Sequence, residues 1–409
     1  MRILLITKNF PPRSCGVGDY ARRLAGELVS AGECVTVLTG PADAPRDVPL
    51  SLIEVPLRGW GDLTRVLDAI AAWAPDRVQF EYSAFSWSRW GVAWWVNAML
   101  FRLRRRGIEV HVGLHEMAVS MRQHPMQVPI ALAQWLHVAL LLAAADRVAV
   151  NMRSRAALLK RLFPWLREKV CYCPNSSTIP VVAQSADERE RFRRGRGVTA
   201  GEIVIATFGL FHGAKNYEGL IEAVARLRPS MPLRLWMLGN IAASPEYVAQ
   251  LRHVAQKTGI EDAVWWPGQL EELEISRALQ AVDVFVLPQP DGHLTRSSAF
   301  MAAAAHGLPV VAVRQPGGRD QAEFTHGENV WLAERSTADE LAAGIRALAS
   351  DSGVAMRMGQ NLRRLYEAQF DWQVTAAAER NAEKNAAPAE APPKHTSVAS
   401  ATTTGGAKL

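Results

Sequence analysis

Four polar residues lie between two strongly apolar stretches, residues 282–287 and 309–313. The four are Thr295, Arg296, Ser297 and Ser298. The apolar stretches are typical of buried strands in a parallel sheet, and the alanine-rich residues 299–305 favour a helix that ends at Gly307. A helix that begins after such a strand presents free backbone N–H groups to anions, so this run predicts a phosphate site. The alternative is a purely structural strand–helix–strand unit.

Two other reactive side chains follow predicted strands. His115 comes directly after the apolar residues 110–114, and Lys215 ends a glycine-bearing loop after residues 204–208. In an α/β sheet, a histidine at the carboxyl end of a strand tends to face the ligand crevice, and a hydrogen bond within its own loop is the alternative. A lysine in the corresponding place can neutralise an anionic leaving group, whereas on an ordinary loop it would be solvated.

Two glycines, Gly16 and Gly18, follow the first predicted strand, residues 3–6. Glycine lets backbone N–H groups approach a ligand closely. With Ala21 these glycines also fit the GxGxxA dinucleotide fingerprint. That match is weak, because no acidic residue stands at the end of the next strand, residues 35–38, to hold a ribose. A nicotinamide-dependent dehydrogenase is therefore a minor alternative.

The elements that position these residues form two successive series of alternating strands and helices. The first series covers residues 1–180 and the second covers residues 201–372, with a polar, charged stretch at 181–200 that predicts a linker. Residues 385–409 consist mainly of Ala, Pro, Thr and Gly without apolar periodicity, which predicts a disordered tail. We therefore expect an α/β protein with two Rossmann-like domains that face each other across a cleft.

The composition is that of a globular protein. The chain has 409 residues, of which 49% are hydrophobic and 21% charged, and this length is long for a single core. Its four cysteines lack CxxC spacing and its start lacks the features of a signal peptide, so we expect reduced thiols, no metal site and a cytoplasmic location. Residues 1–170 hold about 22 Lys and Arg against about 14 Asp and Glu, which favours an anionic partner for this half. Nucleic acid is not expected, because no nucleic-acid-binding motif is present.

Two segments bear on membrane contact. Residues 86–107 combine tryptophans and aliphatic residues with four arginines, which would suit a helix lying on an anionic bilayer at the inner face of a membrane. A buried helix with a solvated basic end is the plainer alternative. Residues 126–145 are the longest apolar stretch, but the proline, glutamines and histidine within them favour a buried helix over a membrane span.

Taken in order, these pieces resemble the retaining glycosyltransferases of family 4, which have the GT-B fold. The resemblance covers residues 1 to about 372 and depends on the order and spacing of several short motifs. These are PP…CGVGDYARRLAGEL, the His115 strand end, ADRVAV with PNSSTIP, GAKNYEGLIEAVARL, LWMLGN, WWPGQLEELEISRALQAVDVFVLP, HGLPVVAV and GENVWL. The resemblance implies sugar transfer, with retention and without a metal or cofactor, from a nucleotide-diphosphate donor to a cell-surface glycan or lipid-linked acceptor.

The resemblance also implies roles for individual residues. His115 would reach the transferred sugar, and Lys215 would neutralise the diphosphate leaving group, so both are expected to be catalytic. The segment 266–268 would contact the nucleotide base through backbone groups. The donor-binding positions are Gly16, Gly18, Gly209, Lys215, Trp266, Gly268, Thr295, Arg296, Ser297 and Ser298.

The sequence departs from the family pattern in its donor motifs. Leu210 stands where the family usually has an arginine, and Leu294 and Ala302 stand where it usually has two glutamates. The second glutamate normally holds the ribose, so donor contacts must differ or be absent. Arg296 or Arg319 would replace the missing cation.

These departures leave two further functions open. The first is a non-catalytic GT-B protein that binds a partner or sugar without transferring it. The second is another GT-B reaction, such as nucleotide-sugar epimerisation, which would require carboxylates converging in the cleft. Glu81 and Glu116 are the strand-end acids available for it.

Overall fold

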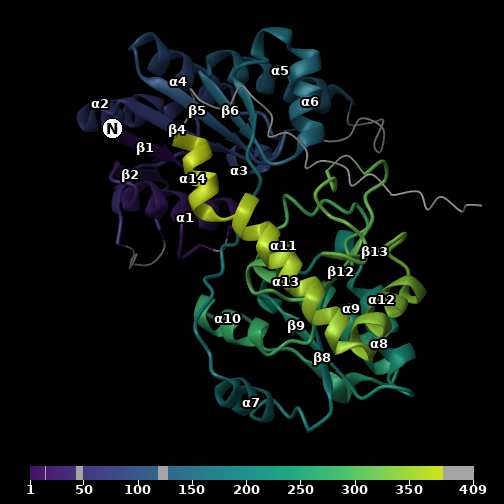
Figure 1. Ribbon diagram of the computed structural model, residues 1–409. Coiled ribbons are helices and arrows are strands. Elements are labelled where there is room, and N and C mark those ends of the chain that lie inside the picture. The colour runs from purple at the N-terminus through teal and green to yellow at the C-terminus, as the bar shows by residue number, and fades with distance from the viewer. Residues whose placement is uncertain (14, 43–48, 118–127, 319, 381–409) are drawn as a thin grey trace, which may run out of the picture.

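The computed structural model describes residues 1–13, 15–42, 49–117, 128–318 and 320–380. Figure 1 shows two α/β bodies, with the N-terminal half above and the second half below. Each body contains one parallel β-sheet with helices packed against it, so the expected fold of two Rossmann-like domains is confirmed. The predicted tail, residues 385–409, and Arg319 lie outside the described residues.

The first sheet has seven strands in the order β3-β2-β1-β4-β5-β6-β7, all paired in parallel. Its strands are β1 (Arg2–Ile6), β2 (Cys34–Thr39), β3 (Ser51–Glu54), β4 (Arg77–Tyr82), β5 (Glu109–Leu114), β6 (Arg147–Val150) and β7 (Val170–Tyr172). The order reverses between β1 and β4. At such a reversal the loops after neighbouring strands diverge and leave a crevice for ligand.

The second sheet has six parallel strands in the order β10-β9-β8-β11-β12-β13. They are β8 (Ile203–Phe208), β9 (Leu233–Leu238), β10 (Val264–Trp265), β11 (Val284–Leu287), β12 (Val310–Val313) and β13 (Trp331–Ala333). Here the order reverses between β8 and β11. The loops after these two strands carry Lys215 and the predicted phosphate-binding run, so the topology brings them to one crevice.

Fourteen α-helices are assigned among the described residues, and they cover both faces of the sheets. They are α1 (Gly16–Ser30), α2 (Leu63–Trp73), α3 (Ala84–Trp87), α4 (Trp94–Arg105), α5 (Val128–Ala144), α6 (Arg153–Leu162), α7 (Ala186–Arg194), α8 (Tyr217–Leu227), α9 (Pro245–Lys257), α10 (Glu272–Gln280), α11 (Ser298–Ala305), α12 (Ala338–Ser350), α13 (Ser352–Gln369) and α14 (Trp372–Arg380).

Helix cover on both faces explains the nearly continuous apolar strands. In β1, Leu4 and Ile6 pack into one buried cluster with β4 and α4, and Ile3 and Leu5 pack into another with α1. The second sheet divides in the same way between two clusters on its opposite faces. The cores therefore hold the strand ends rigidly, and the functional loops leave from these ends.

Two helices bear on the predicted domain boundaries. Helix α7 lies within the predicted linker 181–200 and packs on the second body, where Arg193 donates to Asp283 at 2.8 Å. Helix α14 follows α13, returns to the first body and places Trp372 in the cluster with α1. Figure 1 shows α13 and α14, in yellow, running from the lower body to the upper one. The division at 1–180, 181–200 and 201–372 stays a prediction.

The two segments with membrane character form helices of the first body. Five apolar residues of α4 are buried against the sheet, while its basic end, with Arg102, Arg104 and Arg105, is exposed. This matches the plainer alternative for residues 86–107. Of residues 126–145, 128–144 form α5, which packs beside α4. Among the described residues, no helix is long and apolar enough to cross a membrane.

Candidate active site

The carboxyl ends of the two sheets meet across the interface between the bodies. Asn151 and Asn175 follow β6 and β7, and both contact the loop after β11. The backbone N–H of Asn175 donates to the carbonyl of Thr295 at 3.0 Å, and its side-chain amide donates to the carbonyl of Arg296 at 2.7 Å. The hydroxyl of Thr295 donates to the carbonyl of Asn151 at 3.0 Å. The predicted phosphate-binding run is thus attached to the first body.

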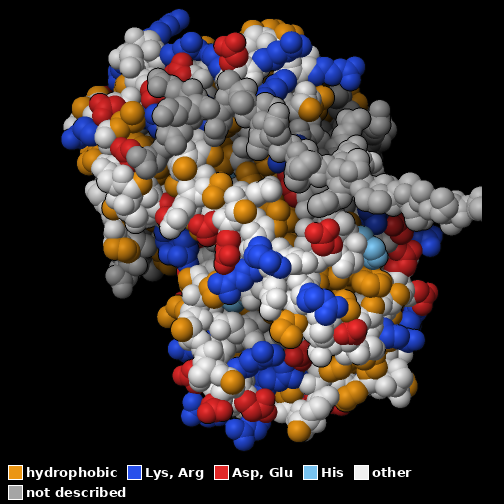
Figure 2. Space-filling model, viewed as in Figure 1, with side chains coloured by type: hydrophobic (Ala, Val, Ile, Leu, Met, Phe, Trp, Pro, Cys, Tyr) orange, Lys and Arg blue, Asp and Glu red, His pale blue; other side chains and the backbone are white. Residues whose placement is uncertain are grey.

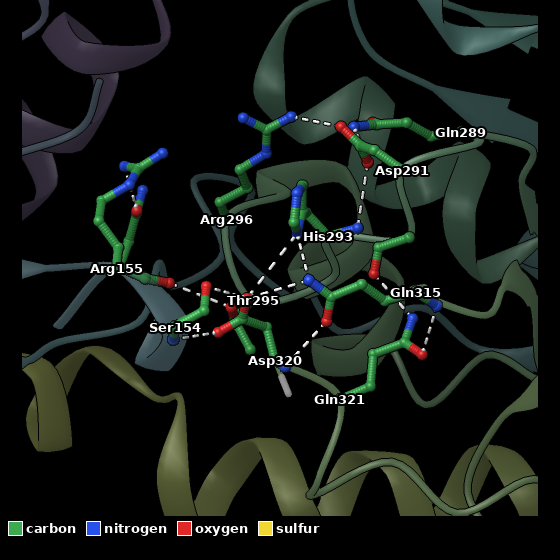
Figure 3. Close-up of polar contacts among 12 residues, drawn as sticks. Ser154, Arg155, Gln289, Asp291, His293, Thr295, Arg296, Gln315, Asp320 and Gln321 are labelled. Atoms are coloured by element: carbon green, nitrogen blue, oxygen red, sulfur yellow. Dashed lines mark hydrogen bonds and ion pairs between the residues drawn. The ribbon is translucent and has the colours of Figure 1, made fainter. Parts of the chain in front are cut away.

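A second contact between the bodies caps helix α6. Asp320 accepts from the backbone N–H of Ser154 at 2.7 Å and from its hydroxyl at 2.5 Å. Gln315 donates to the same carboxylate at 3.0 Å and accepts from the Asp320 backbone N–H at 2.8 Å. Figure 3 shows Ser154, Gln315 and Asp320 converging below His293. Burial opposes ionisation of Asp320, but the hydrogen bonds from Ser154 and Gln315 outweigh it and lower the pKa of Asp320.

His115 lies at the edge of this interface, directly after β5. Its Nε2 is 2.7 Å from Oε2 of Glu81, a buried residue of the adjacent strand β4. Its carbonyl accepts from Arg155 at 2.7 Å, and its ring meets the ring of Tyr20 edge-on with centroids 4.9 Å apart. The predicted strand-end position of His115 is therefore observed, and the residue is held on three sides.

A small cavity opens beside His115. It is lined by Tyr20, Gly113, Leu114, His115, Ala149, Asn151, Cys173, Asn175 and Glu379. Glu379 comes from α14 and is 4% exposed, and its Oε2 has no hydrogen-bond partner among the described residues. Burial, and then the nearby charge of Glu81, raises the pKa of Glu379 to about 7.

Lys215 lies at the crevice of the second sheet. Gly209 follows β8 with φ at 132°, and a Cβ added there would be 3.1 Å from Nζ of Lys215 and 3.9 Å from Cβ of Ala299 in α11. The lysine side chain therefore folds back over this glycine towards the start of α11. Burial, and then the charge of Arg296, lowers the pKa of Lys215 to about 8.

Arg296 is the second cation of this crevice. Its guanidinium donates to Asp291 at 2.5 Å, and Gln289 donates to the other oxygen of the same carboxylate at 2.7 Å. Figure 3 shows Arg296 and Asp291 on the same side of the loop, with Arg155 of the first body at the left. Burial, and then the charge of Arg296, lowers the pKa of Arg155 to about 10. The charge of Arg296 therefore acts on one cation of each body, Lys215 and Arg155.

The start of α11 is capped by Ser297. The Ser297 hydroxyl accepts from the backbone N–H of Phe300 at 3.2 Å, and the helix begins at Ser298 and is followed by Gly307 at φ 68°. Thr295 differs from its partners in the run, because it is buried and its hydroxyl is bound to Asn151. The Thr295 hydroxyl thus cannot donate to a phosphate without breaking that bond.

The remaining predicted donor residues lie at the start of α1 and after β10. At Gly16, the first residue of α1, an added Cβ would meet nothing within 4 Å, so a ligand has room there. At Gly18 an added Cβ would lie 2.7 Å from the carbonyl of Asn9, which gives this glycine a packing role. Trp266 packs against Phe211 beyond the end of β8, and Gly268 follows with φ 79°.

Comparison with known proteins gives a consistent result. The family model for glycosyl transferases group 1 matches residues 188–365. HepE from Anabaena in complex with UDP-glucose superposes with a TM-score of 0.73 over 93% of this chain and 98% of that chain, at 17% identity. The second body is therefore similar to the group 1 glycosyltransferases. The two Rossmann-like domains of the chain form the GT-B fold, as the sequence predicted.

Curated relatives align with this chain over different lengths. The D-inositol 3-phosphate glycosyltransferase of Corynebacterium glutamicum is 25% identical over 57% of this chain, and this chain spans about half of that relative, 56%. The GDP-mannose-dependent alpha-(1-6)-phosphatidylinositol monomannoside mannosyltransferase of Mycobacterium tuberculosis is 23% identical over 92% of this chain and 96% of its own length.

The positions where the sequence departs from the family pattern differ in their burial. Leu294 and Ala302, at the positions of the family's two glutamates, are fully buried in the apolar cluster of the second domain. Leu210, at the position of the usual arginine, is exposed. The acidic groups near the crevice are instead Asp291 and Asp320, and within the described residues no cluster of His, Cys, Asp and Glu is arranged to hold a metal ion.

Several residues of the site were not assigned roles in it by the sequence, among them Arg155, Asp291 and Glu81. Arg155 stands in the first turn of α6, five residues after the end of β6, which is a position that α/β folds use for ligand contact. Asp291 directly precedes Gly292 in the loop that leads to the predicted phosphate-binding run. Glu81 was noted only as a strand-end acid; an acidic residue inside a fully buried strand is the signal that could have indicated its role.

Proposed function

We propose that the protein transfers a sugar from a nucleotide-diphosphate-sugar donor to a glycan or lipid-linked acceptor, with retention at the anomeric carbon. The proposal places the donor diphosphate between Lys215, Arg296 and the start of α11, with His115 at the transferred sugar. It requires no metal, because two cations and a helix N-terminus can offset the charge of the departing diphosphate.

The observation that carries this proposal is the pair of cations Lys215 and Arg296. Burial of a lysine beside an arginine is unfavourable without an anion, and the lowered pKa of Lys215 reflects this cost. Asp291 is the carboxylate bound to Arg296, and Gln289 orients it. A bound diphosphate would replace Asp291 as the counterion of Arg296. Arg296 would then supply the positive charge that the family's usual arginine, replaced here by Leu210, would have given.

A non-catalytic GT-B protein is the second candidate. It is favoured by the burial of Leu294 and Ala302, since no carboxylate stands there to bind a ribose. Such a protein would bind a nucleotide sugar or a glycan and leave the donor intact. The two candidates differ in turnover and not in fold.

The first test is a thermal-shift screen of the full chain against UDP, GDP, ADP, CMP and dTDP at millimolar concentration. A nucleotide that binds the native state raises Tm by mass action. We expect one diphosphate to raise Tm, and the shift to disappear in Lys215→Ala. The matched control is Lys257→Ala, which removes an exposed lysine at the end of α9 in the same domain. No shift with any nucleotide, or equal shifts in both variants, would contradict the assigned donor site.

The second test is hydrolysis or transfer of the corresponding nucleotide sugar. We expect Arg296→Ala to raise the KM for donor about 10- to 100-fold, the effect of losing one charge-assisted hydrogen bond. Arg314→Ala is the control, since Arg314 makes a similar 2.7 Å ion pair with Glu334 at an exposed site. Nucleotide binding without any turnover would favour the non-catalytic candidate.

The acceptor remains part of the proposal. The names of two relatives include D-inositol 3-phosphate and a phosphatidylinositol monomannoside, and the second of these is a lipid. Figure 2 shows basic side chains along the outer rim of the first domain near α4 and α5. A cytoplasmic protein that binds the inner face of a membrane through this domain is consistent with these features.

The side chains best suited to bilayer contact are exposed apolar residues near the start of α4 and in the first half of α5. They are Trp90, Trp94, Leu132 and Leu136. The two segments adjoin, because Gln134 donates to the carbonyl of Trp90 at 2.8 Å. We expect Trp90→Ser combined with Trp94→Ser to weaken cosedimentation with phosphatidylglycerol vesicles, and Trp60→Ser, at another exposed tryptophan, to leave it unchanged. Equal binding of both variants would remove this surface from the proposal.

A further inference from the structure

A buried carboxylate lies behind His115, at the carboxyl end of β4. The Glu81 side chain is fully buried, and all six residues of β4 are buried with it. A carboxylate in such a place is costly unless its oxygens are hydrogen-bonded. Its partners therefore indicate what it is for.

Both oxygens of Glu81 have a partner. Oε2 lies 2.7 Å from Nε2 of His115, and Oε1 accepts from the side-chain amide of Gln79 at 2.9 Å. Gln79 and Glu81 are two residues apart on one strand, so their side chains leave the same face of the sheet. Gln79 thus fixes the plane of the carboxylate that meets the histidine.

The neighbouring strand leaves room for this contact. Glu81 pairs with Gly113 in the register of β4 and β5, and His115 follows two residues later. A Cβ on Gly113 would lie 2.3 Å from Oε2 of Glu81. Any larger residue at position 113 would therefore displace the Glu81 carboxylate from His115. The contact between Glu81 and His115 thus requires glycine at this position.

The other polar groups of His115 are also accounted for. Its carbonyl accepts from Arg155, and its backbone N–H donates to the carbonyl of Tyr82 at 2.9 Å. Its Nδ1 has no hydrogen-bond partner among the described residues. A carboxylate accepts and does not donate, so Glu81 favours the ring tautomer with hydrogen on Nε2 and leaves Nδ1 as an acceptor.

We propose that Glu81 is the positioning residue for His115, holding the hydrogen on Nε2 so that Nδ1 accepts a hydrogen bond from a hydroxyl group of the transferred sugar. This inference rests on the proposed function for the identity of the ligand. It also gives Glu81 an electrostatic part: its buried negative charge lies close to the centre that becomes positive as the sugar separates from the diphosphate.

The first experiment is made on the wild-type protein, does not depend on activity and uses a variant only to assign signals. Long-range ¹H–¹⁵N spectra of the imidazole rings distinguish the two neutral tautomers, and the His115 signals are assigned by their loss in His115→Gln. We expect hydrogen on Nε2 and an unprotonated Nδ1 in the wild-type protein at pH 8. Hydrogen on Nδ1 would overturn the inference.

The second experiment compares two His–carboxylate contacts of β5. Glu81→Gln keeps the side-chain size but removes the charge, and we expect kcat to fall on the order of 10- to 100-fold with the donor KM little changed. Glu109→Gln is the matched control, because Glu109 contacts Nε2 of His111, also at 2.7 Å, at the opposite end of the strand. It should leave kcat unchanged.

A third variant tests the geometry while keeping the charge. Gly113→Ala retains Glu81 but pushes its carboxylate from His115, so it should lower kcat as Glu81→Gln does. An unchanged kcat in Glu81→Gln, with a wild-type melting temperature, would overturn the inference. If the wild-type protein shows no turnover, the proposed function is refuted instead. The NMR measurement of the His115 tautomer would then be the test of whether Glu81 positions His115.

Discussion

Glu379 makes the stability of the protein depend on pH. Its carboxyl is buried in the cavity beside His115, and burial, followed by the charge of Glu81, raises its pKa from an ordinary 4.5 to about 7. The folded protein therefore holds a proton that the unfolded chain releases. Because the native state binds more protons between these two values, its stability falls as pH rises from 4.5 through 7.

The magnitude follows from the size of the shift. A difference of roughly 2.5 pKa units at about 1.4 kcal/mol per unit corresponds to about 3 kcal/mol of lost stability. Glu379→Gln keeps the shape of the side chain and stays neutral at every pH. Relative to wild type, this variant should therefore gain about 3 kcal/mol in its free energy of unfolding between pH 4.5 and pH 8.

The assay is urea unfolding followed by circular dichroism at pH 4.5, 6, 7 and 8. Because a chain of two domains can unfold in steps, the quantity to compare is the difference in transition midpoint between variant and wild type at each pH. Glu222→Gln, on the exposed side of α8, is the control and should show no pH-dependent difference. A Glu379→Gln difference that stays constant from pH 4.5 to 8 would refute the buried, protonated carboxyl.

Three further predictions concern the donor site and its attachment. Because bound diphosphate favours the charged form of Lys215, the Kd for nucleotide, measured calorimetrically, should rise up to about tenfold per pH unit above pH 8; a constant Kd would contradict this. Gly209→Ala should raise that Kd at pH 7, since the new Cβ would meet Nζ of Lys215 at 3.1 Å in a strained backbone conformation. Asp320→Ala should lower the free energy of unfolding, measured in urea, by about 1–2 kcal/mol and should also raise the donor KM. The control is Asp351→Ala, which removes the cap of α13 within one domain and should leave the donor KM unchanged.

Features that depend only on neighbouring residues in the sequence, such as strands and their ends, were predictable from the sequence. The alternating series gave the strands to within two residues in most cases, because buried parallel strands are continuous apolar runs. The position of His115 at a strand end followed from the same local pattern. Helix α14 was missed because its apolar face is short and packs on α1, which is distant in the sequence.

The contacts that complete the site have no local signal. Glu81 meets His115 only through the register of β4 and β5, and Asp320 caps a helix of the other domain. Sequence spacing carries no information about pairs that are 34 and 166 residues apart. The burial of Leu294 and Ala302 likewise depends on how α11 packs, so the sequence showed the missing glutamates but not that these positions had become core.

The return of α14 has a consequence for synthesis of the chain. The sheet of the first domain is complete in sequence at β7, but Trp372, which joins the cluster with α1, and Glu379, which lines the cavity, follow about 200 residues later. At about 5–20 residues per second, the ribosome needs on the order of 10 to 40 s to deliver them. Throughout that interval the nascent first domain lacks the part of the cluster that α14 contributes beside α1, so its last folding step must wait for the second domain to be made.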